Sequence, residues 1–180
     1  MSKAKLSKQD WLAAGFRALA ANGPMAIKAE ALARTLKTTK GSFYWHFADL
    51  AAFKEAMLAL WRDKVAIEVI DDVMAQNDKR MRLRVLVENA ARPAPEEFGG
   101  RKIETAIRAW ALSDPNVSSS LKEMDELRMN FLEQLLEDAG MKDPILAQLV
   151  YGAYIGLDDL ASKERADIRK SLSKLIDMIE

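Results

Sequence analysis

The stretch KGSFYWHF, from Lys40 to Phe47, carries the most information in this 180-residue chain. It places a cation, a glycine, a hydroxyl, large aromatic side chains and the only histidine within about two helical turns. Phe43 and Phe47 stand four residues apart, so they would share one helical face and anchor it to a small core. The other side chains can form hydrogen bonds on the opposite face. The stretch therefore predicts a short helix that packs on one side and contacts a polar partner on the other.

The residues before this stretch predict the helices that would support it. Residues 7–10 read SKQD, the spacing of a capping box, and begin a helix whose apolar face runs through 12–19. Asn22-Gly23-Pro24 ends that helix, and a short, alanine-rich helix follows over 27–36. Residues 37–39 form a tight connection, in which Thr39 is a good N-cap for the next helix. Two short helices joined by such a turn form a helix-turn-helix, whose second helix lies in a DNA groove.

From about Leu6 to Leu60, the chain resembles the DNA-binding domain of the TetR family of bacterial transcriptional repressors. Recognition helices of that family read roughly Lys/Pro-Gly-Ser/Thr-aromatic-Tyr-x-His-Phe, and residues 40–44, 46 and 47 match this pattern. Residues 107–140 also resemble a common subgroup of the family. The resemblance implies an all-α fold, in which an N-terminal three-helix helix-turn-helix DNA-binding domain (1–48) joins a C-terminal helical ligand-binding and dimerisation domain (49–180).

Several positions depart from the family pattern. Lys28 stands where a Thr or Ser usually opens the second helix, and Leu50 replaces a Lys that contacts phosphate in most members. Lys54, one turn further on, is the candidate to replace that contact. Tyr44 and His46 are expected to contact phosphates, and the start of the helix is expected to read bases. Alternatively, His46 only forms a hydrogen bond with a neighbouring backbone carbonyl, and Trp45 folds back on the first helix. The candidate DNA-binding residues are Lys28, Thr39, Lys40, Gly41, Ser42, Tyr44, Trp45, His46 and Lys54.

The distribution of charge provides an independent indication. The whole chain is neutral, with 27 basic and 27 acidic residues, which argues against a general nucleic-acid binder. Residues 1–50 hold eight Lys and Arg against three Asp and Glu, a net charge of +5, and the remainder balances this with −5. A basic end on an acidic body is typical of a protein that offers one end to DNA. The alternative is a solvated basic face without a partner.

Composition argues against several other classes of protein. No cysteine is present, and no apolar run is long enough to span a membrane. The polar start predicts no signal peptide, so we expect a cytoplasmic protein. The single histidine lies on the presumed DNA face, and the adjacent acids at 71–72 and 96–97 would diverge on a helix. We therefore expect no enzyme, no cofactor and no metal site.

Beyond residue 60, the sequence predicts helices throughout. Asp49 begins a helix that carries apolar residues to Met74, and 76–78 break the pattern. A helix over 81–91 precedes a flexible loop over 92–100, which contains two prolines and two glycines. A helix over 101–113 follows. Further helices begin at Asp114-Pro115, at Asp143-Pro144 and near Ile168.

The last two helices are the predicted dimer interface. Gly152 and Gly156, four residues apart, would let another helix approach closely. A helix-turn-helix alone reads too few base pairs, so such proteins pair across a two-fold axis. The alternative is a stripe that packs only within its own subunit. The candidate interface residues are Leu149, Gly152, Ile155, Gly156, Leu172 and Leu175.

The resemblance also implies a pocket for a small molecule among the middle helices. Aromatic and methionine residues at helical spacing are, taken singly, more often ordinary core. Arg108 could bind an anionic ligand, although a pair with an internal carboxylate such as Asp125 is the preferred reading. The candidate lining residues are Trp61, Met81, Arg108, Trp110, Met124, Phe131, Tyr151 and Tyr154.

Together, these features predict a sequence-specific transcriptional regulator. We expect a homodimeric repressor that a small-molecule inducer releases from a palindromic double-stranded DNA operator. The alternative is a helical ligand-binding or partner-binding protein whose DNA binding is weak or lost, which Lys28 and Leu50 favour.

Overall fold

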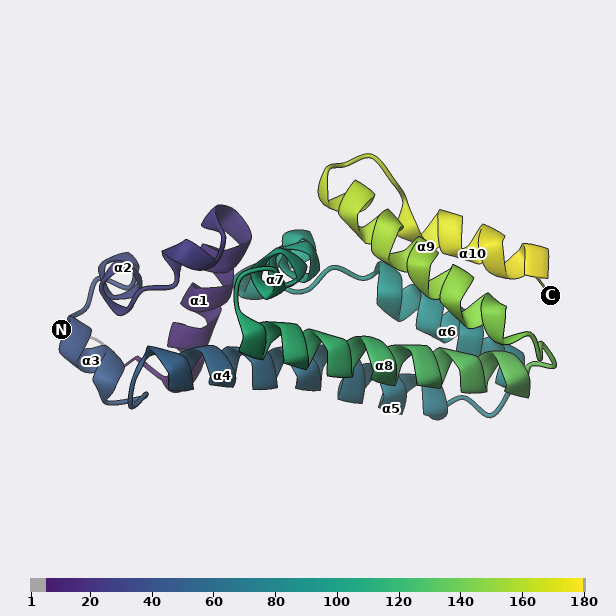
Figure 1. The fold of residues 1–180 in the computed structure, drawn as a ribbon, viewed down its shortest axis with the longest axis horizontal. Coiled ribbons are helices and arrows are strands. Elements are labelled where there is room, and N and C mark those ends of the chain that lie inside the picture. Colours follow the sequence, from purple (N-terminus) through teal and green to yellow (C-terminus); the bar gives the residue numbers. More distant parts are fainter. Residues whose placement is uncertain (1–5, 180) are drawn as a thin grey trace. The chain divides into compact units, whose positions relative to one another are not determined.

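The computed structural model describes residues 6–179, except for the side chain at position 65, and every regular element in that range is a helix (Figure 1). The expected all-α class is confirmed. Residues 1–5, which belong to the polar start expected to carry no signal peptide, lie outside the described residues. Within 6–179, no helix combines the length and the apolar content needed to cross a membrane. The elements are α1 (Lys8–Asn22), η1 (Pro24–Ala26), α2 (Ala29–Thr35), α3 (Lys40–Tyr44), α4 (Leu50–Arg62), η2 (Asp63–Ile67), α5 (Glu68–Met74), α6 (Lys79–Ala91), η3 (Glu96–Phe98), η4 (Gly100–Lys102), α7 (Ile103–Ala111), α8 (Pro115–Asp138), α9 (Pro144–Ser162) and α10 (Ile168–Ile179).

These helices form two compact units. The first unit contains the residues up to Trp61 together with Ala94–Val117, and the second contains Arg62–Pro93 together with the residues from Ser118 onward. The chain first passes between the units at the end of α4, directly before η2, a π-helical turn. The division at residue 48 that the sequence suggests is a division by function, and it stays a prediction.

The predicted helix starts of the first unit are present. The Ser7 hydroxyl accepts a hydrogen bond from the Asp10 N–H at 3.2 Å, and the Asp10 carboxylate accepts from the Ser7 N–H at 2.7 Å. These bonds to Ser7 hold the pKa of Asp10 below its ordinary value. Thr39 caps α3, and Asp49 accepts from the Ala52 N–H at 2.8 Å to begin α4. The capping box and both caps are confirmed.

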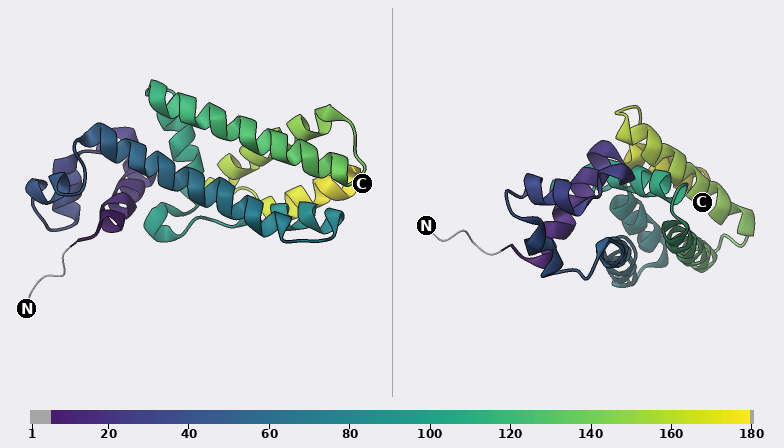
Figure 2. Two further views of the ribbon diagram at one scale, coloured as in Figure 1. Left: turned by 90° about the horizontal axis from the view of Figure 1, so that it is seen from below. Right: turned by 60° about the vertical axis from the view of Figure 1, so that its left-hand side comes forward.

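An aromatic cluster forms the core beneath α3. The Phe43 ring is fully buried, with its centroid 5.4 Å from Trp11, 5.2 Å from Phe47 and 5.3 Å from Phe53. The backbone of α1 approaches α4 closely at Gly15, where a Cβ would lie 2.7 Å from the Phe53 ring. Two further views show α1, α2 and α3 side by side (Figure 2). Aromatic packing, rather than the length of the helix, therefore stabilises the position of α3.

The segment before α7 also packs on α1. The Phe98 ring meets Phe16 edge-on at 5.9 Å, and Arg17 donates a hydrogen bond to the Glu97 carbonyl at 3.3 Å. The sequence predicts a flexible loop over 92–100, whereas the structure has a 3-10 turn at η3 and a second one from Gly100. The two glycines make this possible, because both have positive φ.

The second unit has an aliphatic core. Helix α10 packs against α6 and α9 (Figure 1). Asp78 and Asp143 cap α6 and α9, the second as the sequence predicts. The residues buried in this core are Val73, Leu83, Val87, Ala91, Leu132, Leu135, Leu136, Ala147, Val150, Tyr151, Ala161, Ile168, Leu172 and Ile176.

Candidate nucleic-acid interface

The turn between α2 and α3 sets the direction of the recognition helix. Lys37 has a φ of 53°, a left-handed conformation that is uncommon outside glycine. Its N–H donates to the Arg34 carbonyl at 3.0 Å, and the Thr38 N–H donates to Ala33 at 2.9 Å. These bonds satisfy the last carbonyls of α2 and turn the chain sharply into α3.

Helix α3 and the three residues after it have a buried side and an exposed side. Phe43 and Phe47 are buried, whereas Lys40, Tyr44 and Trp45 are exposed. The Trp45 side chain is 85% exposed, so it does not fold back on α1. This surface displays a cation, a phenol and an indole, all of which can donate hydrogen bonds. We call this exposed side of α3, with the turn before it, the α3 face.

An acidic residue of α2 contacts the cation of this face. The Lys40 ammonium lies 2.8 Å from the Glu30 carboxylate, and both side chains are at least half exposed. The hydrogen bond between them lowers the pKa of Glu30 and raises that of Lys40. Both groups are therefore charged at neutral pH, and Lys40 is not a bare cation in the unbound protein.

Lys54 is engaged elsewhere in the first unit. Its ammonium lies 3.1 Å from the Asp114 carboxylate and 5.4 Å from the centroid of the Trp110 ring. The Trp110 indole N–H donates to the same carboxylate at 3.3 Å. Burial raises the pKa of Asp114, but the hydrogen bond and the charge of Lys54 outweigh this and lower it. Lys54 thus joins α4 to the junction between α7 and α8.

The remaining candidates are exposed or half-buried. Lys28 is exposed at the start of α2 and, as expected, its side chain does not cap that helix. The Thr39 hydroxyl accepts from the Ser42 N–H at 3.4 Å, and Gly41 is exposed beside them. His46 is half-buried, with its ring 6.3 Å from the Phe47 ring.

The ligand-pocket candidates of the first unit have internal partners. Trp61 and Trp110 are buried, and Arg108 lies 3.3 Å from the Glu104 carboxylate one turn earlier in α7. Glu104 is itself buried, so an internal carboxylate does partner Arg108. The pair that the sequence suggests, with Asp125, stays a prediction.

The candidates of the second unit do not gather in one described cavity. Tyr151 donates to the Asp125 carboxylate at 2.7 Å and stacks on Tyr154, with 6.0 Å between ring centroids. Met124 is buried and Phe131 is half-buried, but Met81 is 48% exposed on α6.

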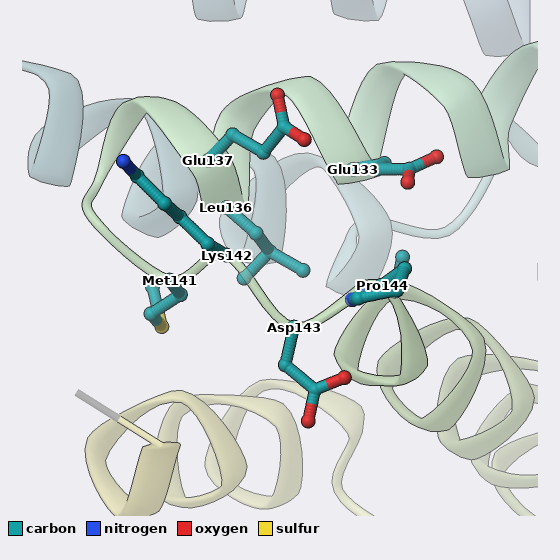
Figure 3. Close-up of a pocket in the computed structure, with 8 residues that line it drawn as sticks. Glu133, Leu136, Glu137, Met141, Lys142, Asp143 and Pro144 are labelled. Atoms are coloured by element: carbon teal, nitrogen blue, oxygen red, sulfur yellow. The ribbon is translucent and has the colours of Figure 1, made fainter.

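A shallow depression lies at the turn between α8 and α9 (Figure 3). Glu133 and Glu137 of α8 line it together with Lys142 and Asp143 of the connection. None of the sequence-predicted pocket residues lines it, and its polar rim indicates a surface feature rather than a ligand site.

The predicted dimer residues are mostly on the surface. Leu149 is 60% exposed, and Gly152 and Gly156 are exposed with open space around them. Ile155 and Leu175 are half-buried. Leu172 is an exception, because it is buried in the core of its own unit.

Sequence reasoning missed two partners within the first unit. Glu30 lies ten positions from Lys40 and Asp114 lies sixty from Lys54, so neither pair has helical spacing. For Glu30, the available signal was that residues 1–50 hold three acidic residues, so each of them is a candidate partner for a nearby cation.

No protein-family model and no curated protein matches this sequence. Solved structures do match over nearly the whole chain. A Rhodococcus sp. protein assigned to the TetR family of transcriptional regulators is 19% identical, with a TM-score of 0.74 over 96% of this chain and 97% of its own. The reduced form of E. coli NemR is 18% identical, with a TM-score of 0.73 over 96% and 97%. A Saccharomonospora viridis protein assigned as a transcriptional regulator, in complex with choline, is 16% identical, with a TM-score of 0.75 over 94% and 95%. The chain thus has the fold of TetR-family transcriptional regulators, as its helix-turn-helix sequence predicts.

Proposed function

We propose that this protein is a sequence-specific DNA-binding transcriptional regulator. The observation that carries the proposal is the division of residues 40–47, whose phenylalanines are buried while Lys40, Tyr44 and Trp45 stay exposed. A short helix of this kind in a helix-turn-helix enters the major groove, where cations and hydroxyls meet phosphates and base edges. The +5 charge of residues 1–50 supports approach to a polyanion.

The proposed DNA contacts follow from exposure and existing partners. Tyr44 and His46 contact phosphates, while Lys40 and Ser42 reach base edges from the start of α3. Trp45 lies against the sugar backbone or a thymine methyl group. Lys54 is left out of this set, because Asp114 and Trp110 already hold it.

We further propose a homodimer formed through α9 and α10. The exposed apolar side chain of Leu149 and the two exposed glycines of α9 support it, since neither is covered within the second unit. Two recognition helices roughly 34–36 Å apart would then read successive major grooves of a palindrome.

Control by a small molecule is the third part of the proposal. A structure with this fold holds choline, which supports a ligand-binding role for proteins of this architecture. Repression ends when the ligand favours a dimer whose recognition helices no longer match the groove spacing. A ligand-bound structure with unchanged spacing between the recognition helices would contradict this mechanism.

The first experiment is selection of bound fragments from the source genome by the purified protein, followed by a salt titration of the best fragment. A palindromic site whose affinity falls steeply with salt is the expected result. Lys40→Ala should weaken binding, whereas Lys122→Ala, which removes an exposed ion-paired lysine from α8, should not.

The alternative function is a helical ligand-binding or partner-binding protein. Two observations favour it, namely that Glu30 engages Lys40 and that Asp114 engages Lys54. Absence of any enriched fragment, with wild-type and Tyr44→Ala proteins equally weak on all DNA, would support this alternative.

A further inference from the structure

Three acidic residues stand among the first fifty, and two of them cap helices. Asp10 completes the capping box of α1, and Asp49 begins α4. The third, Glu30, lies in the first turn of α2 with its side chain 69% exposed. Its carboxylate lies 2.8 Å from the Lys40 ammonium of α3. The acid without a capping role is therefore the one that contacts the recognition helix.

The contact changes the electrostatics of the α3 face. The Glu30–Lys40 pair has no net charge, so Lys40 attracts phosphate less strongly than a bare lysine would. An ammonium has three N–H donors, and Glu30 accepts from one of them. The other two remain available to a partner that offers well-placed acceptors. Both side chains of the pair are at least half exposed to solvent, where a DNA partner could reach them.

Resting on the DNA-binding function proposed above, we propose that Glu30 is a specificity-determining residue that weakens non-specific DNA binding more than operator binding. Non-specific affinity comes almost entirely from phosphate charge, so a neutralised lysine and a nearby carboxylate both reduce it. Operator binding also uses hydrogen bonds to base edges. Lys40 can form such bonds while it keeps Glu30 as a partner. Discrimination therefore rises although total affinity falls.

A purely structural role for Glu30 makes different predictions. Helix α2 has no side-chain cap, and an acid in its first turn interacts favourably with the helix dipole. If Glu30 only stabilised α2, its removal would lower the melting temperature and leave the ratio of the two DNA affinities unchanged. The ratio is therefore the informative measurement.

The test compares wild type, Glu30→Gln and Glu126→Gln on the best selected genomic fragment and on a scrambled fragment of equal length, each over a range of salt. Glu126 forms an exposed ion pair with Lys122 on α8, so Glu126→Gln is a control with the same change in net charge. Glu30→Gln should raise non-specific affinity about threefold to tenfold and steepen its salt dependence by about one released ion. Operator affinity should rise less, so the specificity ratio falls. The control should change neither affinity by more than about twofold.

A second variant tests the pairing itself. In a Lys40→Gln background, the effect of Glu30→Gln on non-specific affinity should shrink, because there is no ammonium left to release. An undiminished effect would overturn the proposed pairing. Thermal denaturation of each variant checks that it is folded.

Other outcomes also separate the hypotheses. Equal non-specific affinities for Glu30→Gln and Glu126→Gln would overturn the inference, as would a loss of operator affinity alone, since Glu30 would then orient Lys40. Either result would leave the DNA-binding function standing. A wild-type protein that enriches no fragment would overturn that function, and the inference with it.

Discussion

The two compact units differ in the aromatic content of their cores. The first unit centres on Phe43, which touches the rings of Trp11, Phe47 and Phe53. The second relies mainly on leucine, valine, isoleucine and alanine from α5, α6, α8, α9 and α10. Large rings allow few arrangements, whereas aliphatic side chains of similar volume substitute for one another with little cost. The position of α3 therefore depends on a few residues, and the second unit depends on many.

The units also differ in what they leave exposed. The first unit displays Lys40, Tyr44 and Trp45 on the α3 face, while the second displays Leu149 and two glycines on α9. A polar and aromatic surface can bind DNA, whereas an exposed leucine beside two glycines can pack against a second protein surface. The first unit is therefore proposed to bind DNA, and the second unit to bind a second copy of the chain.

The largest effect is expected from removing the Phe43 ring, which lies at the centre of the aromatic cluster of the first unit. Phe43→Ala should cost about 3–5 kcal/mol, because it leaves a cavity among three other rings. Urea denaturation measures the loss. Leu135→Ala, which empties a similarly buried site of α8, should cost somewhat less, about 2–4 kcal/mol. A cost below 1 kcal/mol for Phe43→Ala would show that the aromatic cluster does not hold α3.

A charge at Leu149 tests the proposed interface on α9. Leu149→Lys should raise the dimer dissociation constant at least about a hundredfold, close to 3 kcal/mol, because it buries a charge at a two-fold contact. Analytical ultracentrifugation reports the change. Leu112→Lys, the same substitution at an 89% exposed position directly after α7, is the control for charge alone. A dimer unaffected by Leu149→Lys would place the interface elsewhere.

The sequence predicted the first unit well because its signals are local. Capping residues lie three positions from the groups they bind, and Phe43 and Phe47 lie four apart. Each signal specifies a contact directly, so the ends of α1 and the buried side of α3 follow from spacing alone.

Contacts distant in sequence could not be predicted in this way. The Lys54–Asp114 pair depends on how α7 packs beside α4, which no periodicity encodes. The sequence likewise predicts one continuous helix over 49–74, but a π-helical turn interrupts it at Asp63–Ile67. In the second unit, helical spacing identified the apolar face of each helix but did not specify against which other helix that face packs. Leu172 shows this, since it shares the periodicity of the predicted interface but is buried in the core.

The Lys54–Asp114 pair predicts a dependence of stability on pH. The pKa of Asp114 is lowered in the folded state, so its charge stabilises the fold above the ordinary value of 3.8. That contribution is lost as pH falls below 3.8 and through the folded-state pKa. The Asp114 carboxylate accepts from the Asn116 N–H with one oxygen and from the Trp110 indole N–H with the other, so Asp114→Asn keeps one of these two acceptors and removes the charge. It should cost about 1 kcal/mol at pH 7 and almost nothing at pH values where wild-type Asp114 is protonated. Urea denaturation at both pH values measures this, and an equal cost at both would contradict it.

The smallest effect concerns backbone strain, for which each unit supplies one example. Lys37 in the first unit and Glu164 in the second, between α9 and α10, are the two non-glycine residues with positive φ in the described chain. A left-handed conformation costs an L-residue about 1–2 kcal/mol, and the greater unfolded-state entropy of glycine offsets part of its relief. Lys37→Gly and Glu164→Gly should therefore each stabilise the protein by about 0.5 kcal/mol. Denaturation midpoints measure both gains. Equal increases in stability would show that backbone strain accounts for both effects. An increase for Glu164→Gly alone would mean that contacts of the Lys37 side chain stabilise the turn before α3.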